Sequence, residues 1–479
     1  MIRLRHFIDG TWRAASGDRW IPDVNPSDAA DIIAHVPEGE ASDAHAAVEA
    51  AASALESWRV LAGPARAEYL HRWAAVIAAR ADELARAMAR EVGKPIAEAR
   101  GEVARCVVIL RYYAGEAVRE VGSVIPAQVP NALQFTLREP LGVVALITPW
   151  NFPLAIPLWK AAPALAFGNT VVLKPSEASA SMASLLAETA AAAELPPGVF
   201  NVVHGTGPTV GTALLRASAV RGISFTGSSA VGAAVAAIAA ERNVRYQTEM
   251  GGKNVVIVAG DADLDAAAAL TASGAMRYAG QKCTATSRVV IAKEVEQDFL
   301  ARLRAQVEAL PLGPVDDPAA AVGPLISERS HASLTRSLAE AAPERLFGGE
   351  LPHDPRFRRG FYFAPTVIRF ESADAPLAQR ELFGPVLGTL VADDLDHAIA
   401  LANRTPYGLS ASLFTRDLRT ALRYVQRIEA GLVRVNGDTT GVDPHAPFGG
   451  FKGSSSGSRE QGPAAREFYT EIKTVQINP

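Results

Sequence analysis

The early part of the chain has the apolar spacing of amphipathic helices. Between residues 42 and 121, alanine, glutamate and arginine are frequent, and apolar side chains recur at intervals of three and four, as at Tyr69, Leu70, Trp73, Ile77 and Leu84. Glycine and proline interrupt the pattern at 63–64 and 93–95. The segment therefore predicts several helices that break at these two points.

A different rhythm begins near Leu141. Short apolar runs alternate with alanine-rich helical stretches, and the runs cover residues 143–147, 171–173, 199–203 and 223–225. A second alternating series follows Gly251-Gly252, with an apolar run at 255–258, a helix from about Leu264 and another run at 288–291. Strands that alternate with helices are typical of parallel sheets covered by helices. Two series joined at a glycine pair predict two α/β units.

Two strand-like segments fall outside both series. Residues 122–138 lack helical periodicity, and residues 470–477 alternate polar and apolar side chains as a half-buried strand does. Because these segments lie far apart in the sequence, each needs a pairing partner, and another subunit is a candidate for it.

Composition narrows the class of protein and of partner. A chain of 479 residues is longer than a single hydrophobic core usually supports, so we expect two large domains. A content of 49% hydrophobic and 20% charged residues is typical of a folded globular protein, and a formal net charge of −4 gives no reason to expect nucleic acid or anionic lipid as a partner. A small-molecule ligand fits better.

The cysteines and the N-terminus indicate a location. Two cysteines, Cys106 and Cys283, are too few for a disulfide framework, which favours a reducing cytoplasm. The N-terminal residues lack a continuous apolar stretch, and no run of about 18 apolar residues occurs. We therefore expect neither an export signal nor a membrane span.

Cys283 is the first candidate for chemistry. Small neighbours in residues 279–286 leave its sulfur accessible, and Lys282 or local amide dipoles are candidates for lowering the pKa of the thiol. The alternative is a buried cysteine that acts as a small hydrophobe. Cys106, inside an apolar helical stretch, suits that inert role better.

Two polar residues in tight turns are further candidates. Glu249 precedes Met250-Gly251-Gly252 and suits a general base that activates water, although, taken alone, an ordinary turn carboxylate is the more frequent explanation. Asn151, between Pro149-Trp150 and Phe152-Pro153, suits an amide donor to an oxyanion, with a structural asparagine as the alternative.

Several segments suit a dinucleotide. Lys174 and Glu177 follow a predicted strand, at the edge where open α/β sheets bind ligands. The loops at 205–211 and 225–232 are rich in small residues and precede helices, so their amides can face a pyrophosphate, although neither matches Gly-x-Gly-x-x-Gly. Residues 381–386 and 447–453 are further turn-like clusters, and each alone passes as a tight turn.

Taken in order, seven of these segments resemble the aldehyde dehydrogenase superfamily: Pro-Trp-Asn-Phe-Pro from Pro149, Lys-Pro-Ser-Glu from Lys174, Phe-Thr-Gly-Ser from Phe225, Glu-Met-Gly-Gly-Lys from Glu249, Gly-Gln-Lys-Cys from Gly280, Glu-Leu-Phe-Gly-Pro-Val from Glu381 and Pro-Phe-Gly-Gly from Pro447. The resemblance covers nearly the whole chain. It implies NAD(P)-dependent oxidation of an aldehyde to a carboxylic acid through a thiohemiacetal and a thioester on Cys283. It also implies that Asn151 and the Cys283 amide form the oxyanion hole, that Glu249 activates water, and that Glu460 takes part in proton relay.

The resemblance assigns the remaining residues as well. It implies cofactor contacts by Thr148, Pro149, Trp150, Lys174, Glu177, Gly227, Ser228, Glu381 and Phe383, pocket walls of Phe152, Trp159, Thr284 and Phe448, and no metal. A carboxylate at Glu177 favours NAD because it repels a 2′-phosphate, yet relatives with this glutamate also use NADP, so both cofactors stay open.

The implied fold is α/β. It has a Rossmann-like cofactor domain of residues 1–121 and 140–251, an α/β catalytic domain of residues 252–455, and a small β oligomerisation extension and tail at 122–139 and 456–479. The family also implies a homodimer or a homotetramer.

At finer grain, residues 274–288 and 441–447 resemble 2-oxoglutarate semialdehyde (2,5-dioxovalerate) dehydrogenases. Phe451 departs from that subgroup, where a polar or basic side chain is expected, so succinate semialdehyde or another aliphatic aldehyde stays open. Three other functions compete: an acylating enzyme that uses coenzyme A, a cofactor-independent thiol esterase, and a silent scaffold. Glu249 argues against the first, since acylating relatives generally lack it, and Cys283, Asn151 and Glu249 together argue against the third.

Overall fold

The N-terminal helices form where the apolar spacing predicts them. In the computed structural model, which describes residues 2–479, they are α1 (Ala41–Arg59), α2 (Gly63–Ala79), α3 (Ala81–Val92) and α4 (Ile96–Glu116). Pro64 lies in the first turn of α2, where its missing N–H costs nothing, and Gly93 ends α3 in the left-handed conformation. Both predicted breaks are confirmed.

The first strand series folds into an eight-stranded sheet. Its order is β2-β1-β9-β8-β7-β10-β11-β21, and the five strands from β9 to β11 run parallel. The strands are β1 (His6–Ile8), β2 (Thr11–Arg13), β7 (Val143–Ile147), β8 (Thr170–Lys174), β9 (Phe200–Val202), β10 (Val220–Thr226), β11 (Arg245–Glu249) and β21 (Ser455–Gly457). The connecting helices are α5 (Ala155–Ala166), η1 (Glu177–Ser179), α6 (Ala180–Ala192), η2 (Gly207–Gly211), α7 (Thr212–Arg216) and α8 (Ser229–Glu241).

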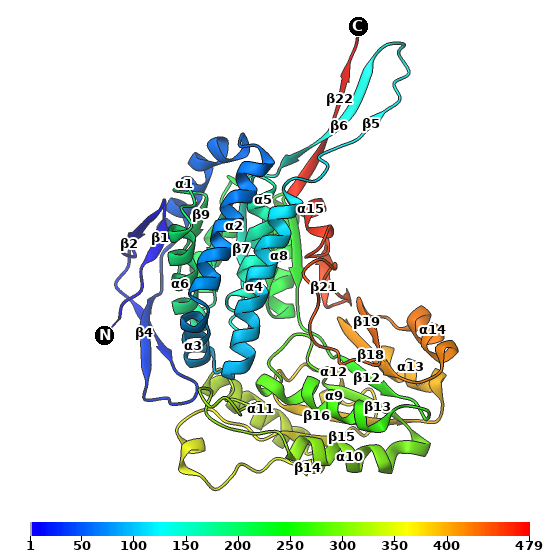
Figure 1. Ribbon diagram of the computed structural model, residues 1–479. Helices are drawn as coiled ribbons and strands as arrows, with labels where there is room; N and C mark the ends of the chain where they lie inside the picture. Colours follow the sequence, from blue (N-terminus) through cyan, green and yellow to red (C-terminus); the bar gives the residue numbers. More distant parts are fainter. Residues whose placement is uncertain (1) are drawn as a thin grey trace.

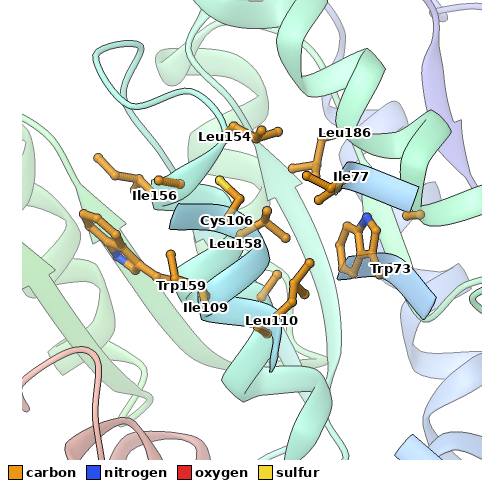
Figure 2. Close-up of a cluster of buried hydrophobic side chains, with 14 of the residues drawn as sticks. Trp73, Ile77, Cys106, Ile109, Leu110, Leu154, Ile156, Leu158, Trp159 and Leu186 are labelled. Atoms are coloured by element: carbon orange, nitrogen blue, oxygen red, sulfur yellow. The ribbon is translucent and has the colours of Figure 1, made fainter. Parts of the chain in front are cut away.

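Helices cover both faces of this sheet because successive strand residues point to opposite sides. Val144 and Leu146 of β7 pack with α2 to α6, whereas Val143 and Ala145 pack with α1, α7 and α8. Figure 2 shows the first of these cores, in which Cys106 of α4 lies among Ile156, Leu158 and Trp159 of α5. Cys106 is fully buried, and burial raises the pKa of its thiol well above the ordinary value, as its predicted inert role requires.

The second series forms a seven-stranded sheet. Its order is β14-β15-β16-β13-β12-β18-β19, and all neighbours except β14 and β15 run parallel. The strands are β12 (Val255–Val258), β13 (Arg288–Ala292), β14 (Glu344–Gly348), β15 (Thr366–Arg369), β16 (Val386–Ala392), β18 (Ser410–Phe414) and β19 (Leu432–Val435). The helices are α9 (Leu264–Met276), η3 (Arg277–Gly280), η4 (Lys293–Val295), α10 (Glu296–Glu308), α11 (Glu328–Ala341), η5 (Pro355–Arg358), α12 (Pro376–Gln379), α13 (Leu395–Asn403) and α14 (Leu418–Arg427).

The chain passes from the first sheet to the second between β11 and β12, across Gly251-Gly252, and returns with β21. Strand order in the first sheet reverses at β7, with β8 and β9 on one side and β10 and β11 on the other. Ligands of open α/β sheets bind at the carboxyl ends of the strands beside such a reversal. The α/β fold with a Rossmann-like first sheet is therefore confirmed.

The strand-like segments at 122–138 and 470–477 pair with each other. β6 (Leu133–Pro140) lies between β5 (Val124–Ile125) and β22 (Thr470–Ile477), with Thr470 opposite Pro140 and Ile477 opposite Leu133. The partner that each segment was expected to need is therefore present within the same chain, where another subunit was one candidate. The three strands project from the body of the molecule (Figure 1), and within the tail α15 (Ala464–Tyr469) packs back onto α5.

Two smaller two-stranded antiparallel sheets complete the fold. They pair β3 (Trp20–Val24) with β4 (Ile32–Pro37), and β17 (Tyr407–Gly408) with β20 (Phe451–Lys452). Within residues 2–479, no helix is both long and apolar enough to cross a membrane. In the same range, no group of three or more His, Cys, Asp or Glu side chains is arranged to hold a metal ion.

Candidate active site

A cleft at the carboxyl ends of β7 and β10 brings many of the predicted residues together. It contains about 830 Å³ of empty space, part of it open to solvent. Eight predicted site residues line it: Pro149, Trp150, Asn151, Gly227, Ser228, Cys283, Glu381 and Phe383. Five residues that sequence reasoning did not select complete the wall: Ile156, Thr226, Met250, Gly251 and Ser330.

The loop that carries Cys283 is held in an unusual backbone conformation. Tyr278, Ala279 and Gly280 all have positive φ angles, which cost free energy for the two non-glycine residues. The side chain of Asn254 fixes the end of this loop, because its Nδ2 donates to the carbonyls of Cys283 and Ala285, both at 2.8 Å. A loop tied down in this way presents a half-buried cysteine at a defined position in the cleft.

The surroundings of Cys283 do not favour a thiolate. Burial, followed by the charges of Glu381 and Glu249, raises the pKa of the thiol to about 12. Lys282, which sequence reasoning offered as a means of lowering this pKa, points elsewhere: its Nζ donates to Glu98 Oε2 at 2.9 Å. Lys282 therefore does not lower this pKa, whereas the backbone amides of Thr284 and Cys283, the other source that was expected, oppose the rise.

Asn151 lies beside the cysteine loop. Its Nδ2 donates to the carbonyl of Gln281 at 3.0 Å, and its backbone carbonyl accepts from Lys94 Nζ at 2.7 Å. Lys94 and Glu102 form a fully buried ion pair, and Glu102 Oε1 accepts from the amides of Leu154 and Ala155 at the start of α5. The turn that carries Asn151 is thus fixed from both sides.

Glu249 is buried at the end of β11. Its Oε2 accepts from Ser455 Oγ at 2.6 Å, while its Oε1 has no partner among the described residues. Burial, and then the charge of Glu460, raises the pKa of Glu249 well above its ordinary value, although the Ser455 hydroxyl opposes this. A carboxyl group with a raised pKa and a free oxygen suits a general base.

Glu460 belongs to a buried polar network with two predicted wall residues. Its carboxylate accepts from Lys160 Nζ, from Trp159 Nε1 at 2.7 Å and from Ser224 Oγ at 3.1 Å. Trp159 packs against Phe448 with ring centroids 5.6 Å apart, and Phe448 and Glu460 exchange backbone hydrogen bonds. Lys160 was not predicted as a site residue. It is the single lysine in the otherwise apolar α5, and this pattern could have identified it.

Glu381 and Phe383 form the opposite wall of the cleft. Glu381 Oε1 accepts from the amide of Gly252 at 3.1 Å, and Phe383 contacts Trp150 edge-on with ring centroids 5.6 Å apart. Burial raises the pKa of Glu381 to about 7, and the Gly252 amide and Lys253 oppose this rise. A Cβ atom at Gly251 would lie 2.1 Å from Glu381 Oε2, so a larger residue there would require the Glu381 carboxylate to move.

The residues of the cleft fit a dinucleotide. Gly227 and Ser228 lie between the end of β10 and the start of α8, and the buried hydroxyl of Thr226 has no partner among the described residues. Lys174 Nζ donates to Glu177 Oε1 at 3.4 Å beside the same sheet edge, and the hydroxyl of Thr148 is also buried and unpartnered in residues 2–479. These groups offer donors and acceptors to a ribose and a pyrophosphate.

Two of the predicted pocket walls have other neighbours. The Phe152 ring lies 4.0 Å from Lys94 Nζ, so it packs on the buried ion pair. Thr284 is buried behind Cys283, and its carbonyl accepts from Thr439 Oγ1 at 2.7 Å. Sequence reasoning missed Lys94, Glu102 and Asn254, which position the site from outside it.

Comparison with known proteins identifies the family. Residues 12–475 match the model of the aldehyde dehydrogenase family. The chain is 43% identical to the alpha-ketoglutaric semialdehyde dehydrogenase of Bacillus subtilis (strain 168) over 99% of this chain and 98% of that protein. It is 41% identical to the alpha-ketoglutarate semialdehyde dehydrogenase of Haloferax volcanii over 98% of each chain.

A solved structure agrees in fold and in sequence. The NAD-dependent aldehyde dehydrogenase of Sinorhizobium meliloti superimposes with a TM-score of 0.94 and 38% identity, covering 99% of this chain and 95% of that one. With a family match over nearly its full length and relatives above 40% identity, the chain belongs to the aldehyde dehydrogenase family.

Proposed function

We propose that this enzyme oxidises 2-oxoglutarate semialdehyde to 2-oxoglutarate through a covalent intermediate on Cys283. As an aldehyde dehydrogenase it converts an aldehyde to a carboxylic acid with NAD or NADP. The observation that carries the proposal is the meeting of Cys283, Asn151 and the residues that fit a cofactor in one cleft. The two relatives above 40% identity, which both carry the name of that substrate, support its choice.

The first half of the reaction uses Cys283 and Asn151. The thiol gives its proton to water in the solvent-open part of the cleft, and its sulfur bonds to the aldehyde carbon, so that the carbonyl oxygen gains the negative charge of a thiohemiacetal. Asn151 Nδ2 and the amide of Cys283 donate to that oxygen, which stabilises the charge as it develops. Bound NAD or NADP would supply the hydride acceptor for oxidation of this thiohemiacetal to a thioester.

The second half uses Glu249. Its carboxylate takes a proton from water, the hydroxyl oxygen bonds to the thioester carbon, and the carbon–sulfur bond breaks to release the acid and the cysteine. Ser455 orients the carboxyl group of Glu249. The charges of Glu460 and Lys160 act on the same group, and they shift its pKa in opposite directions. We assign proton relay from Glu249 to the network of Glu460 and Lys160. Because Glu249 is present, water is a better acceptor of the acyl group than coenzyme A.

We assign different functions to the parts of the chain that form the two sheets. We assign cofactor binding to residues 1–121 and 140–251, and the nucleophile to residues 252–455. Thr148, Lys174 and Glu177 would then hold the adenosine end of the cofactor, Gly227 and Ser228 the pyrophosphate, and Trp150, Glu381 and Phe383 the nicotinamide end. Glu177 is part-exposed and favours NAD, because its carboxylate suits a ribose hydroxyl better than a phosphate.

We also propose a homodimer or homotetramer in the cytoplasm. The three-stranded extension of residues 122–139 and 470–477 is the surface that we assign to assembly. Both cysteines are free, which suits a reducing compartment.

The test is an assay of the purified enzyme with 2-oxoglutarate semialdehyde, succinate semialdehyde and pentanal, each with NAD and with NADP. We expect reduced cofactor to form fastest with 2-oxoglutarate semialdehyde and NAD, as measured by its near-ultraviolet absorbance. The Cys283→Ala variant should form none, and the Cys106→Ala variant serves as the matched thiol control. A higher kcat/KM for succinate semialdehyde would show that the proposed substrate is wrong. If the enzyme cleaves esters without a cofactor and oxidises no aldehyde, it is a thiol esterase instead.

A further inference from the structure

Arg105 is a half-buried cation to which no described residue gives a hydrogen-bond partner. It lies on α4, next to Cys106, and its Nε is buried without a hydrogen-bond partner in residues 2–479. The charges of Asp443 and Glu102 act on it only from a distance, without a hydrogen bond, and burial lowers the pKa of the guanidinium. Because arginine keeps its charge in proteins, a half-buried guanidinium whose Nε has lost water without gaining a partner costs free energy unless an anion binds it.

The position of Arg105 on α4 relates it to the nucleophile. Glu98, Arg105 and Tyr112 are seven residues apart and therefore share one face of the helix, with about 10 Å between successive members. Glu98 binds Lys282, the neighbour of Cys283, and Tyr112 packs near His445 with ring centroids 6.5 Å apart. Arg105 thus lies between the cysteine loop and the loop at 441–447.

Side chains of α5, one of which lines the cleft, pack on the same turn of α4 as Arg105. In Figure 2, Cys106 lies beside Ile156 and Trp159 of α5, all within one buried cluster. Ile156 lines the cleft that contains Cys283. The turn of α4 with Arg105 and Cys106 is therefore close to the part of the cleft that an aldehyde chain would enter.

The other cations around this region already have partners. Lys282 and Arg277 both bind Glu98, and Lys160 binds Glu460. Arg434 donates to the carbonyl of Gly441 and lies 3.9 Å from Asp438 Oδ1. Arg105 differs from these four groups, because its Nε lacks a partner within the described part of the chain.

We infer that Arg105 binds the carboxylate of the substrate at the end opposite the aldehyde. This inference rests on the proposed function and adds the residue that recognises an acidic aldehyde. The guanidinium matches a carboxylate through two parallel N–H donors, which fixes orientation as well as charge. A short aldehyde acid held by Arg105 extends its aldehyde toward Cys283, whereas an uncharged aldehyde leaves the guanidinium unsatisfied.

The experiment compares Arg105→Met with Arg111→Met, a matched variant at an exposed arginine on the same helix. The measured quantity is the ratio of kcat/KM for 2-oxoglutarate semialdehyde to kcat/KM for pentanal. Loss of a charge-assisted hydrogen-bond pair predicts that Arg105→Met lowers this ratio about 10- to 100-fold, mainly through KM. Arg111→Met should leave the ratio at the wild-type value.

A second readout uses glutarate, which carries a carboxylate at each end, as an inhibitor against pentanal. Wild type and Arg111→Met should be inhibited, and Arg105→Met should not. Arg105→Lys keeps the charge without the planar fork and should fall between them, so it provides the test if Arg105→Met does not fold. Equal losses with both aldehydes would show a structural role and overturn the inference, as would an unchanged ratio. If the wild type oxidises no aldehyde at all, it is the proposed function that fails.

Discussion

Glu249 shows how a single side chain sets the pH dependence of the reaction. The carboxylate is the form that accepts a proton from water, yet burial and Glu460 raise the pKa of Glu249 well above its ordinary value. A raised pKa means that the group is protonated at a pH where an exposed glutamate is already ionised. The active form of the base is therefore lost as pH falls through this raised pKa and gained as pH rises.

We predict that Glu249→Gln separates the two halves of the reaction. The amide cannot accept a proton, so hydrolysis of the thioester should slow while its formation continues. Steady-state kcat should fall about 100- to 10,000-fold, the usual contribution of general base catalysis, while stopped-flow measurement still shows a burst of one reduced cofactor per site. In the wild type, kcat should rise with pH, and this rise should vanish in the variant.

The control for this prediction is Glu371→Gln, which changes an exposed glutamate in the same way. It should keep both the burst and the steady-state rate. A burst that falls in parallel with kcat in Glu249→Gln would assign Glu249 to thioester formation, contrary to the proposed mechanism.

At the scale of elements, the start of α4 organises the site through the buried pair of Lys94 and Glu102. Lys94 holds the carbonyl of Asn151, and Glu102 receives the first amides of α5, which would otherwise lack acceptors. The positive end of the α5 dipole also favours a carboxylate at this place. The pair thus links α4, α5 and the turn between β7 and α5.

We predict that Lys94→Met destabilises the protein by about 3 to 5 kcal/mol, because it leaves the charge of Glu102 buried and unpaired. The double variant Lys94→Met/Glu102→Gln should regain part of this loss, since the remaining amide carries no charge. Urea-induced unfolding measures the change. Arg86→Met, which removes an exposed pair with Asp82 on α3, should cost no more than about 1 kcal/mol. A cost of Lys94→Met equal to that control would contradict the role of the pair.

The same elements show what sequence can and cannot predict. Cys283, Asn151 and Glu249 were selected because each lies in a short segment with its own pattern, and the strands and helices followed from apolar periodicity. The partners were not visible: Lys94 meets Asn151, and Asn254 meets Cys283, only after folding. Lys282 adjoins Cys283 in the sequence, but an ion pair with Glu98 determines where it points.

Strand pairing in the extension illustrates the same limit. Alternation of polar and apolar residues identifies residues 470–477 as a strand, but it contains no information about which segment lies beside it. β22 pairs with β6, from a distant part of the chain, because α15 and the first sheet bring the two segments to the same edge of the molecule. Pairing over such a separation depends on the whole fold.

The extension has consequences for the whole molecule. It projects from the body (Figure 1), and its strands expose Val124, Leu133, Ile472 and Ile477 to solvent in the single chain. β5 and β22 are the two edges of this sheet, and each edge presents backbone groups without a partner strand. A projecting sheet of this kind is marginally stable alone, and exposed apolar side chains on unpaired edges favour association with another chain.

We predict that Val124→Lys together with Ile472→Lys shifts the enzyme from a dimer or tetramer toward the monomer. Two charges, one on each face of the extension, oppose its burial against another subunit, while β6 and β22 keep their hydrogen bonds to each other. Light scattering after size-exclusion chromatography measures the mass. The matched control is Val60→Lys, which adds a charge at an exposed valine after α1 and should keep the wild-type mass. An unchanged mass in the double variant would show that the subunits associate through another surface. A wild type that is already monomeric would contradict the proposed role of the extension in assembly.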